Sequence, residues 1–94
     1  MTKADIVEII SANTGITKIE TEAVVNGFLD TVIESLKQGE KIELRGFGTF
    51  KVVKRARRIA RNPKTNQEVT VPEQHVPVLK VSKDFKKDVN EKWS

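Results

Sequence analysis

The sequence predicts a single domain of the α+β class. Apolar residues follow a helical period up to about residue 38, and after Gly39 a two-residue strand period replaces it. A helical pattern returns near Ser82 and runs almost to the end of the 94-residue chain. Helices followed by a block of strands and one last helix are the order of an α+β fold, with residues 1–94 as one domain.

The first helix is predicted from its two ends. Thr2 and Asp5 have the spacing of a capping box, so a helix should begin near Lys3. Apolar residues then recur at helical spacing, and Gly15 is suited to end the helix.

A longer second helix is predicted from a second box at Thr17 and Glu20 to about Gln38. Its apolar residues are Ala23, Val24, Val25, Phe28, Leu29, Val32, Ile33 and Leu36. This stripe is wider than the roughly 100° that covers one surface, so the helix needs neighbours on two sides, and we expect a second copy of the chain to supply one. Gly27 costs about 1 kcal/mol in mid-helix relative to alanine, and we interpret it as a point of close approach for a packed helix.

Two strands joined by a tight turn are predicted next. Residues 41–45 alternate between polar and apolar, Gly46-Phe47-Gly48 makes the turn, and a second strand begins at Thr49. The two glycines do not lead into a helix, so they do not indicate a phosphate-binding loop.

Residues 51–76 are predicted to form a protruding two-stranded ribbon, called the arm below. The strand pattern continues through Arg61, residues 62–66 carry turn-forming Asn and Pro, and a return strand follows. Each side could extend roughly 30 Å. Pro72 and Pro77 remove ladder donors from the return strand, which suits an exposed edge.

A short last helix is predicted after Ser82. Phe85, Val89 and Trp93 share one face at intervals of four residues. We interpret Trp93 as a packing residue of that face, with a base-stacking platform as the alternative.

The charge is distributed unevenly along the chain. Residues 1–50 have five Lys or Arg against eight Asp or Glu, a net charge of −3, and residues 51–94 have twelve against five, a net charge of +7. Seven Lys or Arg and no acid lie between Lys51 and Gln67. So many unpaired charges cannot be buried, and on a ribbon they suit a nucleic acid. The alternative is a solvated charge run that protects an edge strand from aggregation.

Several functions are excluded by composition. The chain has no Cys, no apolar run near the length of a membrane span and no signal-peptide pattern, so we expect a cytoplasmic protein that does not contact membranes. His75 is the single histidine and has no metal-ligand partners in sequence. No catalytic constellation can be assembled, so we expect no enzyme, no cofactor and no small-molecule substrate.

Pro63 can be interpreted in two ways. It stands between Arg61 and Lys64, rigid and apolar, and could be a wedge that separates stacked base pairs. It could also be an ordinary turn proline. The residues alone favour the turn.

Three motifs together resemble the bacterial HU/IHF family of DNA-bending proteins. They are Gly46-Phe47-Gly48-Thr49-Phe50, Arg61-Asn62-Pro63-Lys64-Thr65 and Val76-Pro77, and the resemblance covers about residues 1–90 without gaps. It implies an intertwined α+β dimer, with helices under a saddle of strands and two arms around the minor groove of double-stranded DNA. A homodimer is expected, with a heterodimer as an alternative, associated with the nucleoid.

The resemblance also implies roles for individual residues. It makes Pro63 the intercalating residue at the arm tip. With Arg57, which the sequence adds to that pattern, the DNA-binding residues that we expect are Arg55, Arg57, Arg58, Arg61, Asn62, Pro63 and Lys64 on the arm, and Lys80, Lys83, Lys86 and, more weakly, Lys3 on the body.

This sequence departs from the family pattern at several arm positions. Val53 stands where a basic residue is common, and Lys54 and Arg57 add charge at neighbouring sites that strand alternation sends to the other face. Ala60 and Asn66 stand where glycine is common, so the tip conformation could differ.

Two further functions remain open from the sequence. An HU-like protein binds any duplex, and this function is slightly favoured. An IHF-like protein prefers sites that bend easily. Residues 42–46 resemble the IHF β subunit and support this second function. A structural RNA-binding protein is the alternative from another class.

Overall fold

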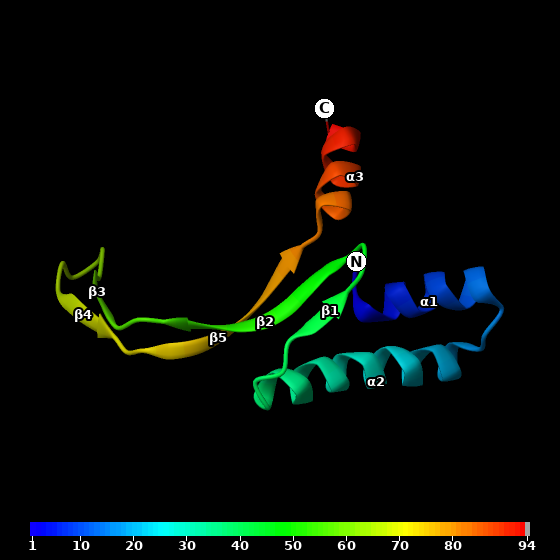
Figure 1. Ribbon diagram of the computed structural model, residues 1–94, viewed down its shortest axis with the longest axis horizontal. Helices are drawn as coiled ribbons and strands as arrows, with labels where there is room; N and C mark the ends of the chain where they lie inside the picture. The colour runs from blue at the N-terminus through cyan, green and yellow to red at the C-terminus, as the bar shows by residue number, and fades with distance from the viewer. Residues whose placement is uncertain (94) are drawn as a thin grey trace.

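The computed structural model describes residues 1–93 and has the predicted order of helices, strands and helix (Figure 1). The elements are α1 (Lys3–Thr14), α2 (Lys18–Lys37), β1 (Ile42–Leu44), β2 (Gly48–Arg55), β3 (Arg58–Arg61), β4 (Glu68–Val71), β5 (Gln74–Val81) and α3 (Lys83–Trp93). The α+β class is confirmed.

Both ends of α1 are formed by the residues that predict them. The Asp5 backbone N–H donates to Thr2 Oγ1 (3.3 Å), and the Thr2 N–H donates to Asp5 Oδ2 (2.8 Å), so the capping box is complete. Gly15 has φ 78°, and its N–H donates to the Ser11 carbonyl. A left-handed residue that satisfies a late carbonyl is a common way to end a helix.

The helix α2 begins and ends as predicted, but its glycine has no close neighbour. Thr17 caps it by accepting from the Glu20 N–H (3.2 Å). A Cβ atom added at Gly27 would have no atom within 4 Å. The interpretation of Gly27 as a close-approach point is therefore wrong within the described chain, because neither α1 nor the sheet comes close to this position.

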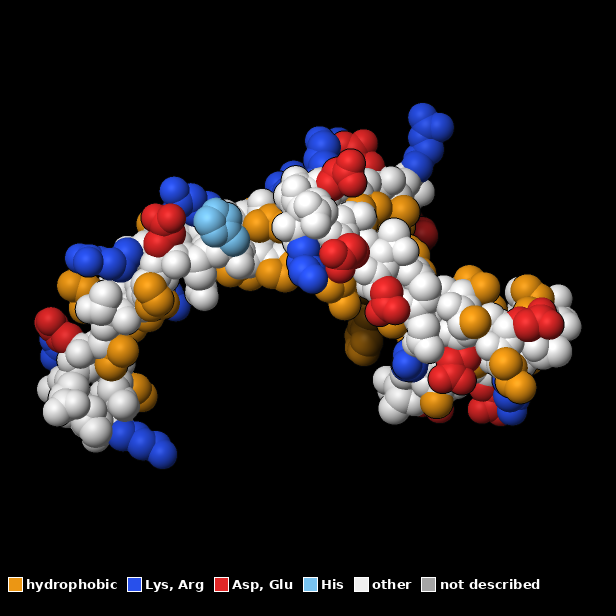
Figure 2. Space-filling model, turned by 90° about the horizontal axis from the view of Figure 1, so that it is seen from below, with side chains coloured by type: hydrophobic (Ala, Val, Ile, Leu, Met, Phe, Trp, Pro, Cys, Tyr) orange, Lys and Arg blue, Asp and Glu red, His pale blue; other side chains and the backbone are white. Residues whose placement is uncertain are grey.

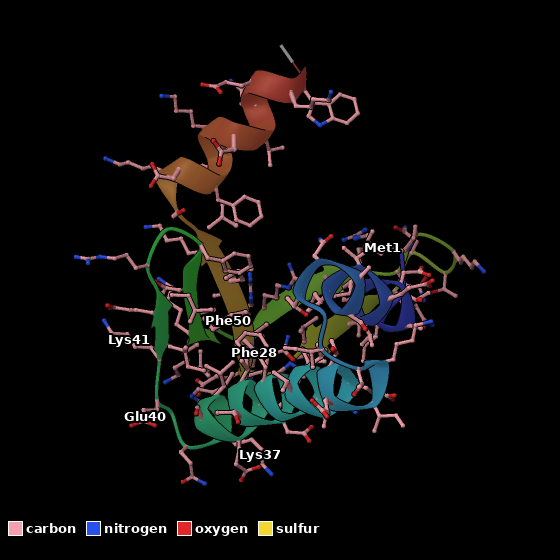
Figure 3. The ribbon with its side chains drawn as sticks, turned by 90° about the vertical axis from the view of Figure 1, so that its right-hand side faces the viewer. Met1, Phe28, Lys37, Glu40, Lys41 and Phe50 are labelled. Carbon is pink, nitrogen blue, oxygen red and sulfur yellow. The ribbon has the colours of Figure 1, made fainter. Side chains whose placement is uncertain are left out.

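The strands β1, β2 and β5 form an antiparallel sheet in that order. The ladder between β2 and β5 runs through eight residue pairs, from Gly48 opposite Val81 to Arg55 opposite Gln74. At its inner end, Phe50 of β2 and Phe28 of α2 lie in the space between the helix and the sheet (Figure 3). This sheet joins the helical half to the arm.

The arm is broken into two ribbons. The strands β3 and β4 pair with each other in a sheet of their own, separated from β2 and β5. The strand predicted to run unbroken to Arg61 stops at Arg55, and Pro72 lies between β4 and β5, outside the return strand where it was predicted. Pro77 does lie in β5, opposite Val52. Pro72 has no N–H to donate, which weakens pairing at the break.

The helix α3 is held against the turn between β1 and β2. Ser82 caps it by accepting from the Phe85 N–H (3.1 Å), and its Oγ donates to the Gly46 carbonyl (2.9 Å). The Phe47 and Phe85 rings meet edge to face at 5.2 Å. Trp93, in contrast, is 85% exposed, so the prediction that it packs is wrong within the described chain, where α3 has no neighbour beyond its first turns.

The chain has almost no core of its own. Val7 is the one buried hydrophobic residue among residues 1–93, and Thr21 is the buried polar one. The radius of gyration is 18.5 Å, against about 12 Å for a compact domain of this length. The accessible surface is 8176 Å², whereas a folded monomer of this mass exposes about 5,500 Å².

The close approach at Gly48 predicts a strong effect of one methyl group. A Cβ at this position would lie 2.6 Å from the Lys80 carbonyl oxygen and 3.1 Å from Val81 Cα, both of them backbone atoms. We expect Gly48→Ala to lower the free energy of unfolding by about 1–3 kcal/mol, measured by urea denaturation.

Gly46→Asn is the matched control for this prediction. Gly46 has φ 80°, which Asn tolerates, and open space around it. Its effect should stay within about 0.5 kcal/mol. Equal stability of Gly48→Ala and the parent would show that the β2–β5 ladder can shift there without cost.

Candidate nucleic-acid interface

The arm combines many exposed cations with few acidic residues. It has seven Lys or Arg against two Glu, a net charge of +5. Lys51 is half-buried, and the other six cations are exposed. Figure 2 shows the arm as a curved projection with Lys and Arg side chains along it, whereas Asp and Glu side chains gather over the helical end.

The pairing of β2 with β5 divides the arm cations between two faces. Lys54 lies opposite His75, and Arg55 opposite Gln74, so strand alternation sends their side chains to opposite sides. Lys54 Nζ lies 3.3 Å from Glu73 Oε1. Val53 shares its face with Arg55, because the two are separated by one residue in β2.

Two arginines meet at the break in the arm. Arg55 at the end of β2 and Arg58 at the start of β3 line a concave site of about 310 Å³, together with Pro72 and Gln74. Arg57 lies between the two ribbons, where no ladder fixes its face. The break thus brings separate cations together at one concave surface, which suits a bound phosphate.

The tip of the arm is a closed turn with an exposed proline. The Asn62 N–H donates to the Gln67 carbonyl (2.9 Å), and the Asn66 N–H donates to the Asn62 carbonyl (2.7 Å). The Asn62 side chain accepts from the Lys64 N–H (2.9 Å). These bonds hold Pro63 at the end of the arm, where it is exposed.

A second group of cations lies on the body. Lys80 of β5 and Lys83 of α3 line a groove of about 550 Å³ with Arg45, which follows β1. Sequence reasoning did not select Arg45. Its position beside the Gly46 turn was the available signal, but that turn meets the start of α3 through contacts between residues far apart in sequence, Ser82 with Gly46 and Phe85 with Phe47.

Lys86 and Lys3 are not brought into this group. Lys86 lines a different groove, beside Phe85, Val89 and Trp93. Lys3 Nζ donates to Asn26 Oδ1 (2.8 Å) and so ties α1 to α2. In one chain neither residue joins the arm or the body groove.

The described residues also bear on other kinds of site. Residues 1–93 hold no cluster of three or more His, Asp or Glu arranged to bind a metal ion. None of the three helices combines the length and apolar character that a membrane span requires.

The whole of this architecture matches known proteins. A family model described as "Bacterial DNA-binding protein" matches residues 1–90. The chain belongs to this family. The HU protein of Clostridium pasteurianum is 39% identical over 90 residues, which cover 96% of this chain and 99% of that protein. The integration host factor subunit β of Hahella chejuensis is 41% identical over 91 residues, covering 96% and 93%.

Solved structures agree with the family assignment. The HU of an Anabaena HU–DNA cocrystal has a TM-score of 0.88 and 36% identity, and the match covers 95% of this chain and 97% of that one. The protein is thus a DNA-binding architectural protein of the HU/IHF family, a family that is not known for catalysis. The roles of the individual arm and body residues remain predictions.

Proposed function

We propose that the protein binds double-stranded DNA as a dimer and bends it, with the arms in the minor groove and Pro63 inserted between base pairs. The observation that carries the proposal is the tip of the arm. A rigid, apolar residue stands exposed at the end of a hydrogen-bonded turn, on a ribbon with a net charge of +5. Because it is proposed to bind and bend DNA, we also propose that the protein is associated with the bacterial chromosome.

The width of the ribbon supports bending. The minor groove of B-DNA is about 6 Å wide, and two strands lie about 4.8 Å apart before their side chains are counted. A ribbon enters only if the groove widens, and an apolar wedge that unstacks a base step opens it while kinking the duplex toward the major groove. Pro63 has the shape and the position for this wedge.

The body cations supply a reason for DNA to stay bent. Unstacking one base step costs on the order of a few kcal/mol, and added contacts with the flanks of a bent duplex offset that cost. The groove that Arg45, Lys80 and Lys83 line is suited to phosphates of such a flank. Lys86 and Lys3 are further candidates for contact with a DNA flank, but they lie outside this groove, so the DNA or a second chain would have to extend the contact surface to include them.

The exposed apolar surface supports a dimer. The chain exposes about 2,700 Å² more than a compact monomer of its mass, so two copies have about 5,400 Å² of excess surface, near the upper end of the total area that obligate dimers bury. The exposed residues include Ile9, Phe28, Leu29 and Ile33 of the two long helices. A homodimer would cover them, provide the missing neighbours of Gly27 and Trp93, and give the complex two arms.

We propose HU-like binding with low sequence specificity. The arm presents cations and an apolar tip, which contact features common to all duplexes. IHF-like site preference is the second candidate, because the chain is 41% identical to the Hahella chejuensis subunit β. A binding panel of random duplex, nicked duplex, selected bent sites and RNA separates these modes, and equal affinity for RNA would overturn the DNA proposal.

Coupled folding and dimerisation predict a concentration-dependent melting temperature. With about 0.7 kcal/mol of unfolding enthalpy per residue, each tenfold increase in protein concentration should raise Tm by about 4 °C. Calorimetry over a hundredfold range measures this shift. A constant Tm together with a monomer mass by sedimentation would rule out the dimer.

Phosphate contacts by the arm predict a steep salt dependence. The logarithm of the association constant should fall with the logarithm of salt concentration by about 0.9 per phosphate neutralised. Arg58→Ala should reduce that slope by about one per arm and weaken binding to all duplexes alike.

Lys92→Ala is the control for the salt experiment. It removes the same charge from the last turn of α3, away from the arm, and should leave the slope unchanged. Equal slopes for Arg58→Ala and the parent would remove Arg58 from the interface.

The wedge predicts a selective defect in Pro63→Ala. This change keeps every charge and removes the rigid tip, so the variant should still bind straight duplex but bend it less, by on the order of tens of degrees. Energy transfer between dyes at the two ends of a duplex measures the bend. The defect should shrink on nicked DNA, where part of the unstacking cost is absent.

Pro77→Ala is the matched control for the wedge, because it removes a proline from β5 at the base of the arm, opposite Val52, and leaves the break and the tip intact. It should bend DNA as the parent does. If Pro63→Ala bends intact duplex as strongly as the parent, Pro63 is a turn residue and the wedge mechanism is wrong.

A further inference from the structure

The tip turn has an unusual backbone at one residue. Asn66 is the one non-glycine residue among residues 1–93 with a positive φ, 59°. Its N–H donates to the Asn62 carbonyl and closes the turn. Asn adopts this left-handed conformation more readily than most residues, so it can form the turn in place of glycine.

The side chain of Asn66 has a contact that glycine could not make. Its Oδ1 accepts a hydrogen bond from Arg61 Nη1 at 3.2 Å. Arg61 Nη2 lies 3.8 Å from Glu68 Oε1, across the β3–β4 pair. The guanidinium is therefore held between the turn and the facing strand, two residues before Pro63.

We propose that Asn66 is a positioning residue for Arg61, fixing its guanidinium beside the tip so that it reaches a phosphate next to the base step where Pro63 acts. The proposal rests on the DNA-binding mode given above. It assigns the Asn66 side chain a part in DNA binding that its backbone role in the turn does not require.

The physical reason is preorganisation. A free arginine side chain has many rotamers and loses that freedom when it binds a phosphate. An anchor that already restricts Arg61 lowers the entropy lost on binding. Arg61 keeps 61% of its side chain exposed, so the anchored guanidinium remains open to a ligand. With five N–H donors, it can hold both Asn66 and a phosphate.

The test separates the side chain of Asn66 from its backbone. Asn66→Gly keeps the positive φ accessible and removes only the acceptor. The experiment compares the parent, Asn66→Gly, Arg61→Ala and the double variant for affinity toward a 30-base-pair random duplex at one salt concentration. We expect Asn66→Gly to weaken binding about fivefold and Arg61→Ala about tenfold, with the double variant within about twofold of Arg61→Ala alone.

The free protein gives a second readout. Nitrogen relaxation of the Arg61 Nε–H should show a lower order parameter in Asn66→Gly, whereas the Nε–H of Arg58, which is remote from Asn66 on β3, should not change. Loss of order at Arg61 alone would support anchoring by the side chain of Asn66.

Three outcomes would overturn the inference. Asn66→Gly could bind as the parent does, which makes Asn66 a turn residue only. The fivefold loss could persist in full when Arg61 is alanine, which assigns it to a more flexible turn backbone. If Arg61→Ala itself binds as the parent does, the phosphate contact of the proposed function fails first, and the positioning role fails with it.

Discussion

The ladder between β2 and β5 is the interaction on which the other parts of the molecule depend. Its eight pairs join residues 48–55 to residues 74–81, and the arm is the chain between them. At one end of the ladder, Gly48 lets β5 approach closely and Ser82 fastens α3 to the β1–β2 turn. At the other end it holds the base of the arm. A change of register would displace the arm and α3 together.

The second constraint is the apolar surface that the ladder and the helices leave uncovered. One chain folds into elements with correct caps and pairings, but it buries little beyond Val7 and Thr21. In this protein one chain thus forms its helices and strands without forming a hydrophobic core of its own. The hydrogen bonds of one chain specify the elements, whereas the hydrophobic stabilisation that most domains obtain from a core is small within one chain.

Local signals predicted most of the fold. The helix caps at Thr2 and Thr17 and the turn around Pro63 depend on residues within three or four positions of each other, so their chemistry is visible in the sequence. The break in the arm was not predicted, because a proline removes one hydrogen-bond donor from a strand but does not show whether the two strands separate at that point. The packing predicted for Gly27 and Trp93 is not found within one chain, since helical spacing predicts an apolar face but does not identify what covers it.

In the candidate interface, too, some features were predictable from local sequence and others depend on the fold. The charge of the arm was evident from composition, because seven cations without an acid cannot be buried. Which cations act together was not evident. Arg45 lies beside Lys80 and Lys83 only because of the fold, and Lys54 forms an ion pair with Glu73.

The opposite net charges, −3 on residues 1–50 and +5 on the arm, make the chain an electric dipole. In the field of a duplex this dipole turns the arm inward before contact, within about a Debye length, and leaves the acidic end facing outward. The acidic end repels a polyanion, so the charge distribution favours contact of the duplex with the arm over contact with the helical end.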